Sequence, residues 1–269
     1  MPGRLVVCPT PIGNLEDITL RVLRALREAD VIACEDTRQT RKLLTRHEIG
    51  GSRLVSYHEH NERRRARELA ERVRRGETVA LVSDAGTPGV SDPGAVVVGE
   101  CLAEGLPVEV LPGPSAVVTA LVASGLGSER WRFAGFLPRR EGELRRELEA
   151  AAGETLVAYE SPRRVGTTLR VLAGVDPDRP VAVCRELTKL HEEVVRGSAA
   201  ELAERFAEGA RGEVVLVVGP AAEPGREAID LASAQAAVER LVEAGAKRRA
   251  AASVVASLTG IAANRLYGR

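Results

Sequence analysis

Short apolar runs rich in β-branched residues alternate with helical patterns through the first half of the sequence, and this alternation limits the fold more than any other feature. Helical patterns occupy 17–29 and 61–76, between runs that are too short to be helices. Regular alternation of strand and helix builds a mostly parallel sheet that helices cover on both faces. We therefore predict an α/β fold with strands at 4–8, 31–34, 53–57, 78–82 and 107–111.

The two helical segments carry signals for their buried side and their ends. Segment 61–76 starts at Asn61, a residue type that caps helix N-termini, and stops at Gly76. The apolar residues of 17–29 that share one side of an amphipathic helix are Ile18, Val22, Leu26 and Ala29.

The second half repeats the α/β pattern and then changes character. We expect an N-terminal α/β domain at 1–118, a C-terminal α/β domain at 119–222 and a helical extension at 223–269, with a linker at 220–227. The extension ends in a helix–Thr-Gly–helix pattern that resembles a helix-turn-helix, but we favour a helical cap with an incidental turn. Strands of the second domain are expected at 132–137, 154–159, 180–184, 191–197 and 213–219.

Composition and charge exclude several classes of partner. Apolar residues make up 44% of the chain and charged residues 28%, as in a soluble globular protein. The formal net charge is zero, so any anionic partner must be met by local basic patches. We find neither a signal peptide nor an apolar run long enough to cross a membrane. We therefore expect a cytoplasmic protein with no membrane partner.

The cysteines and histidines do not predict a metal site. His58 and His60 are the one close histidine pair, and without further ligands we expect hydrogen bonding within their loop rather than zinc binding. No two cysteines form a CxxC pair. Buried free thiols in a reducing compartment are the expected state of Cys8, Cys34, Cys101 and Cys184.

Four loops that follow predicted strands are richer in charge and turn residues than bare connections need. They are 9–17, 35–40, 58–62 and 83–94. In a parallel sheet the carboxyl ends of the strands form the ligand-binding edge, so these loops predict one shared site. The Gly-rich signatures of dinucleotide and P-loop binding are absent. The two Pro-Gly pairs of 83–94 allow the backbone to approach a small zwitterionic ligand closely.

Six segments together resemble one family. They read "TPIGNLEDITLRVLRALREADVIACEDTRQTRKLL", "YHEHN", "LVSDAGTPGVSDPG", "PGPSA", "FAGFLPR" and "YESPRR", and they occur in the order expected for that family. The family is ribosomal small-subunit methyltransferase I, the 16S rRNA cytidine 2′-O-methyltransferase branch of the tetrapyrrole methylase superfamily. The resemblance extends from the N-terminus to about residue 220, and the helical tail is also similar.

The resemblance implies two α/β domains of the tetrapyrrole methylase type, a homodimer, and S-adenosylmethionine bound in the cleft between the domains. Relatives keep a Gly-Asp-Pro loop where this chain has Gly86, Thr87 and Pro88, so we expect Asp84 to compensate for the lost aspartate. The cofactor-binding residues implied in this way are Pro11, Ile12, Asp84, Ala85, Gly86, Thr87, Val90, Ser115, Ala116, Tyr159, Gly212 and Val214.

Three carboxylates at strand ends are candidates for the chemistry. Methyl transfer to a ribose hydroxyl needs alignment of the reacting groups and help in removing the hydroxyl proton. Glu35, Asp36 and Glu160 stand at suitable places. Their ordinary structural explanation is as helix N-caps or ion-pair partners of Arg38 and Arg163, and the sequence leaves the base unassigned.

The resemblance implies 16S rRNA in the small ribosomal subunit as partner, with a decoding-centre cytidine as acceptor. Few aromatics argue against an RNA-stacking platform, so basic loops should hold the RNA backbone. A tetrapyrrole or protein methylase, and a non-catalytic ribosome-binding protein on a methylase scaffold, are the alternatives. The candidate RNA-binding residues are Arg38, Arg41, Lys42, His58, His60, Asn61, Arg139, Arg140, Arg163, Arg164, Lys189, Lys247 and Arg248.

Overall fold

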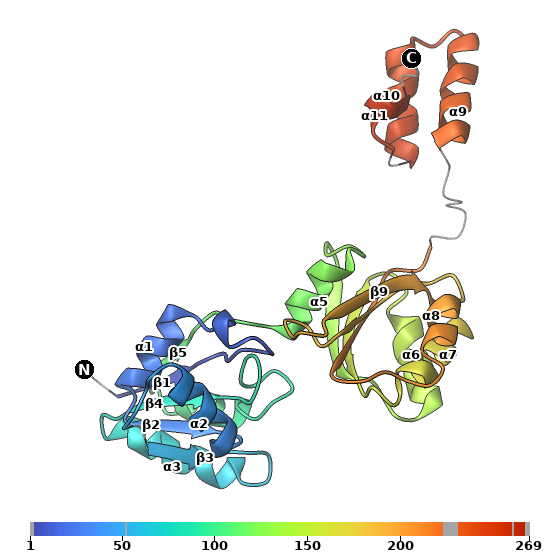
Figure 1. The fold of residues 1–269 in the computed structure, drawn as a ribbon. Coiled ribbons are helices and arrows are strands. Elements are labelled where there is room, and N and C mark those ends of the chain that lie inside the picture. Colours follow the sequence, from blue (N-terminus) through green and yellow to red (C-terminus); the bar gives the residue numbers. More distant parts are fainter. Residues whose placement is uncertain (1–2, 52, 223–230, 260, 267–269) are drawn as a thin grey trace. The chain divides into compact units, whose positions relative to one another are not determined.

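The structure is a computed structural model, and it describes residues 3–51, 53–222, 231–259 and 261–266. The chain divides into two compact units, Met1–Ala221 and Ala222–Arg269. The first unit contains two sheets, and the second is helical (Figure 1).

The first sheet has five strands in the order β3-β2-β4-β1-β5, and all of its pairings are parallel. This confirms the predicted parallel sheet. The central strands β2 and β4 are buried almost throughout, as expected for continuous runs of Val, Ile, Ala and Leu. The strands are β3 (Arg53–Ser56), β2 (Val31–Cys34), β4 (Thr78–Val82), β1 (Arg4–Val7) and β5 (Val108–Val110).

Four helices cover the first sheet on its two faces. Side chains alternate across each strand, so Val6 and Ile32 face α1 and α2, whereas Leu5 and Leu81 face α3 and α4. The connection that leaves β4 therefore turns to the opposite face from those that leave β1 and β2. A crevice at the carboxyl ends of these strands is the usual ligand position in such sheets. The helices are α1 (Leu20–Glu28), α2 (Thr37–Arg46), α3 (Glu62–Arg74) and α4 (Ala95–Ala103).

The predicted helix at 17–29 begins three residues later than expected. Asn14 caps a short 3-10 helix, η1 (Leu15–Asp17), by accepting a hydrogen bond from the Glu16 amide. The hydroxyl of Thr19 then accepts from the Val22 amide and starts α1. The Thr19 cap therefore starts the helix at Leu20, and Asp17 belongs to the preceding 3-10 helix.

The second sheet is mixed, with the order β6-β7-β10-β8-β9. Only β6 and β7 are parallel, and the other pairs are antiparallel. Helices α6 (Glu141–Ala150), α7 (Val165–Ala173) and α8 (Ala199–Arg205) pack on one face, and α5 (Ala116–Ser124) packs on the other. The strands are β6 (Trp131–Phe136), β7 (Thr155–Glu160), β10 (Val214–Val218), β8 (Pro180–Arg185) and β9 (Glu193–Ser198).

The passage from the first sheet to the second lies between the end of β5 at Val110 and the start of α5 at Ala116. Residue 118, where we place the end of the first domain, falls inside α5. Ala120 and Leu121 of this helix are buried against strands of the second sheet. The helix therefore belongs with the second sheet by its packing.

The second unit consists of α9 (Leu231–Glu243), α10 (Arg248–Thr259) and α11 (Ala263–Leu266), drawn in orange to red in Figure 1. These helices bury Ala234, Val238 and Ala252 against one another. Most of the predicted linker, and Gly260 of the Thr-Gly turn, lie outside the described residues. Among the helices of the described chain, none is both long and apolar enough to span a bilayer.

Candidate functional site

The loops that leave β1 and β4 are joined at the carboxyl edge of the first sheet. The backbone amide of Thr10 donates to the carbonyl of Gly86 at 2.8 Å, and the Gly86 amide donates to Thr10 at 3.0 Å. The Thr10 hydroxyl donates to the Ser83 carbonyl at 2.9 Å. Gly86 adopts a φ of 79°, a conformation that favours glycine. The two loops therefore present one continuous backbone surface.

A cavity of about 310 Å³ lies beside this backbone surface. Every predicted cofactor-binding residue except Pro11 and Asp84 lines it. Sequence reasoning missed several lining residues, some inside the motifs above and some on the second sheet outside them, because nothing in their local sequence shows that they face the cavity. The missed residues are Ser91, Asp92, Phe136, Ser161, Pro162, Cys184, Leu187, Glu213 and Val215.

The wall of the cavity on the second sheet is apolar and aromatic. The ring of Tyr159 lies 5.0 Å from that of Phe133 and 5.5 Å from that of Phe136 between centroids. Phe136 is exposed and lines the cavity, and so does Val215, which pairs with Tyr159 across β10 and β7. Such a wall accepts a flat apolar group, while the backbone of the opposite loops offers polar contacts.

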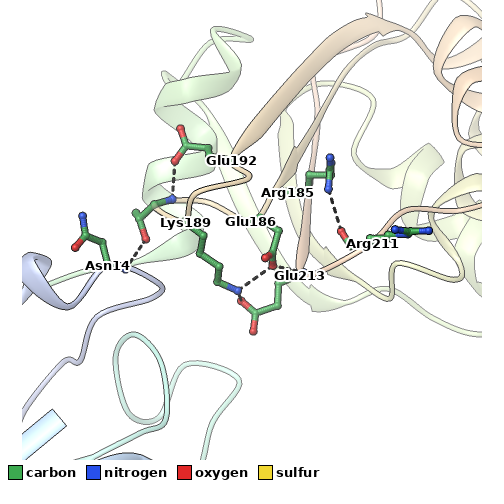
Figure 2. Close-up of polar contacts among 8 residues, drawn as sticks. Asn14, Arg185, Glu186, Lys189, Glu192, Arg211 and Glu213 are labelled. Atoms are coloured by element: carbon green, nitrogen blue, oxygen red, sulfur yellow. Dashed lines mark hydrogen bonds and ion pairs between the residues drawn. The ribbon is translucent and has the colours of Figure 1, made fainter. Parts of the chain in front are cut away.

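Residues 185–192 form the segment that connects the second sheet to the loop after β1 (Figure 2). Glu186 and Thr188 have left-handed backbones, with φ of 51° and 67°. The amide of Asn14 donates to the Thr188 hydroxyl at 3.0 Å, and Leu187 between the two strained residues lines the cavity. Strain of this kind persists only where surrounding contacts hold it, and it gathers at functional sites.

Lys189 is occupied by two carboxylates of the same region. Its ammonium group donates to Glu186 Oε1 and to Glu213 Oε2, each at 2.9 Å, as Figure 2 shows. The pKa of Glu186 is lowered by its hydrogen bond from Lys189 and by the Glu213 amide. Lys189, predicted to bind RNA, therefore stands in an internal ion-pair network in this structure.

Two glycines permit close approach around this network. A Cβ on Gly13 would lie 2.5 Å from Lys189 Cγ and 2.9 Å from the Leu187 carbonyl oxygen. A Cβ on Gly212 would lie 2.4 Å from Glu186 Oε1, and Gly212 also has a φ of 80°. Any larger residue at either position must displace the segment 185–192 or a wall of the cavity.

Glu160, a predicted catalytic residue, lines the cavity but is fully engaged. Its side chain has no exposed surface. Oε2 accepts from the Thr168 hydroxyl at 2.6 Å, and Oε1 accepts from the Ser161 amide at 2.7 Å. Arg164 lies 3.3 Å from Oε1, and its guanidinium also donates to the carbonyls of Leu137 and Pro138. In this structure both carboxylate oxygens of Glu160 are engaged in contacts within the second sheet and α7, and Arg164 is one of their partners.

Glu35 and Asp36 follow β2 and do not line the cavity. Asp36 caps α2 by accepting from the Arg38 amide at 2.8 Å, and its carboxylate pairs with the Arg38 guanidinium at 2.9 Å. These bonds to Arg38 lower the pKa of Asp36 to about 2. Asp84 Oδ1 accepts from the Asp36 amide at 3.1 Å, which ties the loops after β2 and β4 together.

Acidic side chains gather where these loops meet. Burial raises the pKa of Glu35, and the charge of Asp84 raises it further. Burial, and then the charges of Glu35 and Asp84, raise the pKa of Asp92 to about 6. Of these three, Asp92 is the one that lines the cavity.

The candidate RNA-binding residues fall into separate places. Arg38, Arg41 and Lys42 line a shallow depression on α2 together with Arg46, which the sequence analysis did not single out. Asn61 is at the N-cap of α3, but its side chain accepts from the His58 amide at 3.0 Å instead of capping the helix. Among the other arginine candidates of the first unit, Arg139, Arg140 and Arg163 are exposed.

The remaining candidates are divided between the two units. His60 packs its ring against that of His58, with 5.9 Å between centroids. Lys247 directly precedes α10 in the second unit, and Arg248 pairs with Glu239 at 2.6 Å. No group of three His, Cys, Asp or Glu side chains with the arrangement of a metal site occurs within the described ranges.

The sequence matches the family of Tetrapyrrole (Corrin/Porphyrin) Methylases over residues 4–203, which include both sheets except β10. The chain belongs to this family. This membership confirms the predicted fold class.

Individual relatives of this methylase agree with that assignment. Ribosomal RNA small subunit methyltransferase I of Halalkalibacterium halodurans is 43% identical, over 98% of this chain and 93% of its own length. The protein of the same name from Mycobacterium tuberculosis is 46% identical over the same shares.

Solved structures resemble this methylase as well. The uroporphyrin-III C-methyltransferase of Thermus thermophilus, solved in complex with S-adenosylhomocysteine, superposes with a TM-score of 0.56 at 22% identity. The superposition covers 81% of this chain and 97% of that one. At this identity the likeness concerns the fold.

Proposed function

We propose that this methylase transfers a methyl group from S-adenosylmethionine to the ribose 2′-hydroxyl of a cytidine in the decoding centre of 16S rRNA. The observation that carries the proposal is the similarity to ribosomal RNA small subunit methyltransferases I, at 43–46% identity over 98% of the chain. Similarity of that extent includes the loops around the cavity as well as the sheets.

The cavity fits S-adenosylmethionine in size and chemistry. Its volume of about 310 Å³ lies within the range of small-molecule sites. The backbone at Ala85–Thr87 and at Ser115 offers polar groups to an amino acid moiety, while Phe136 and Tyr159 offer an apolar wall to a purine. When bound there, this donor supplies an electrophilic methyl group on a sulfonium.

The contribution of the chain is first of all to position the reacting groups. The paired backbones of Thr10 and Gly86, and the strained segment at Glu186 and Thr188, hold the walls of the cavity in place. Fixed walls reduce the entropy that must be lost to align a nucleophile with a methyl group. The Asp84 carboxylate, which we expect to compensate for the missing aspartate of the Gly-Asp-Pro loop, accepts from the Asp36 amide and is not among the residues that line the cavity.

Because the net charge of the chain is zero, local groups of basic side chains must bind the RNA. The basic face of α2, formed by Arg38, Arg41, Lys42 and Arg46, follows directly from the loop after β2 and is exposed apart from its pairing with Asp36. Phosphate contacts from such a face supply affinity without reading sequence. We propose further that the protein acts as a homodimer in the cytoplasm, where its ribosomal substrate is found.

One experiment tests the function against a tetrapyrrole methylase. The protein is incubated with methyl-labelled S-adenosylmethionine and either small ribosomal subunits or a porphyrinogen, and the label is located. Label on a ribose 2′-oxygen of 16S rRNA is the expected result. Label on a porphyrin carbon would refute the proposal, and no transfer to either substrate together with no detectable cofactor binding would favour a binding protein on a methylase scaffold.

A further inference from the structure

Methyl transfer to a hydroxyl must dispose of the hydroxyl proton. A neutral hydroxyl is a weak nucleophile, and a side chain placed to take its proton accelerates such reactions. That side chain has to line the same cavity as the donor. It must also have a free proton-accepting atom near neutral pH.

Five titratable groups line the cavity, and four of them are unsuited to this task. Both oxygens of Glu160 are engaged, and Glu213 is paired with Lys189 and points largely to solvent. Burial raises the pKa of the Cys184 thiol to about 11, and burial also raises that of the Tyr159 phenol, so both stay protonated. The fifth group is Asp92.

Asp92 differs from the other lining carboxylates in being half-buried and unengaged. Within the described part of the chain its carboxylate has no hydrogen-bond or ion-pair partner. An unpaired carboxylate at a cavity wall retains its desolvation cost, and a positioned substrate group can relieve that cost by donating a hydrogen bond.

The loop before α4 is shaped to hold Asp92 in this position. Ser91, immediately before it, has a left-handed φ of 61°, which is uncommon for a residue other than glycine. The loop closes tightly on itself, since a Cβ on Gly94 would lie 2.7 Å from the Gly89 nitrogen. Strained backbone beside a cavity is the kind of outlier that points to function.

The charged groups that act on Asp92 come from two loops of the first sheet. Glu35 follows β2, and Asp84 lies at the start of the same loop as Asp92, after β4. Tyr159 faces the cavity from β7 and feels the charge of Asp92 in turn. Burial together with the two like charges brings the pKa of Asp92 to about 6, close to the value that suits a base working near neutrality.

We propose that Asp92 is the catalytic carboxylate that accepts the proton of the acceptor hydroxyl during methyl transfer. This rests on the proposed function. In the balanced step the acceptor oxygen bonds to the methyl carbon, and its proton passes to the Asp92 carboxylate. The electron pair of the broken carbon–sulfur bond remains on sulfur, and Asp92 then releases the proton to solvent.

The test compares the intact protein with Asp92→Asn, which keeps the size of the side chain and removes the proton acceptor. Single-turnover methylation of small ribosomal subunits is measured from pH 5 to 8, with the ribose product identified. The wild-type rate should rise about tenfold per pH unit below pH 6 and then level off, because the carboxylate must be ionised. Asp92→Asn should be slower by about 100-fold or more and lose this dependence.

Readouts other than activity separate catalysis from folding. Binding of S-adenosylhomocysteine by calorimetry should change less than threefold in Asp92→Asn, and the midpoint of thermal unfolding should not fall. Carboxyl NMR should show a group titrating near pH 6 in the wild type and not in Asp92→Asn. The matched control Glu100→Gln, in α4 and not among the residues that line the cavity, should keep both the rate and that titration.

A third variant tests the origin of the elevated pKa. Asp84→Asn removes one of the two neighbouring charges, so the titration of Asp92 should move to lower pH. Full activity of Asp92→Asn, or a loss matched by lost cofactor-product binding, would overturn the assignment while leaving the proposed function intact. A wild-type protein that does not methylate ribose would overturn both.

Discussion

Replacement of Glu160 by glutamine distinguishes a structural carboxylate from a catalytic one. The side chain has no exposed surface and accepts from Thr168 at 2.6 Å and from Ser161 at 2.7 Å. Glutamine keeps the shape, and the Thr168 hydroxyl can turn to accept from the new amide. What is lost is the negative charge that strengthens both hydrogen bonds and pairs with Arg164 at 3.3 Å.

The expected loss of stability follows from these contacts. Each of the two charge-assisted hydrogen bonds loses about 1 kcal/mol when the side chain becomes neutral. Loss of the ion pair with the half-buried Arg164 removes about 1 kcal/mol more. Glu160→Gln should therefore lower the free energy of unfolding by about 3 kcal/mol. In a unit of this size, that corresponds to a fall in the unfolding midpoint of roughly 6–12 °C.

The assay is thermal unfolding followed by circular dichroism, paired with methyl transfer at 20 °C, where the variant remains folded. Thr168→Val serves as the matched comparison, because it removes one hydrogen bond and keeps the charge, and it should cost about 1–2 kcal/mol. We expect Glu160→Gln to retain methyl transfer within about threefold. An unchanged unfolding midpoint together with a rate loss above 100-fold would refute this reasoning and indicate a catalytic role for Glu160.

Three further substitutions test other parts of the structure. Gly13→Ala places a Cβ 2.5 Å from Lys189 Cγ, so it should destabilise the protein by about 1–3 kcal/mol. It should also weaken the binding of S-adenosylhomocysteine, measured by calorimetry, at least fivefold, and unchanged binding would contradict this prediction. The double change Arg41→Gln and Lys42→Gln should reduce the salt dependence of ribosomal RNA binding by about one to two counterions, seen in filter binding at several salt concentrations, without altering cofactor-product binding. Arg179 is only 2% exposed and donates to two backbone carbonyls. Arg179→Met should therefore lower the free energy of unfolding, measured in urea, by about 3 kcal/mol. A loss below about 1 kcal/mol would show that these hydrogen bonds contribute little to stability.

The sequence predicts the sheets well because their signals are local. Runs such as 31–34 and 78–82 consist of residues that are either apolar or β-branched, and they form strands with those bounds. The helix expected at 17–29 starts only at Leu20, because Thr19 caps it there and Asn14 caps a separate 3-10 helix that ends at Asp17. The mixed pairing of the second sheet also has no local signal.

The candidate site divides in the same way. Gly86 and Ala116, which the loop motifs single out as cofactor-binding residues, line the cavity, and their role in binding stays a prediction. Leu187 and Val215 come from strands and turns of the second sheet, and only the three-dimensional packing brings them to the cavity. Asp92 belongs to the loop 83–94, which the sequence singles out, but its raised pKa depends on burial and on the charges of neighbouring loops, which the sequence does not show.

The hydrogen bond from the Asn14 amide to Thr188 has a consequence for measurements in solution. Leu187, beside that bond, and Ile12, two residues before Asn14, both line the cavity. A small molecule that fills the cavity therefore contacts segments that follow strands of both sheets, and its binding stabilises their contact within the first unit. Its contribution to stability grows with the logarithm of its concentration. In a thermal shift titration with S-adenosylhomocysteine, Thr188→Ala should begin at a lower midpoint than the wild type, while the bound molecule partly restores what the lost hydrogen bond supplied.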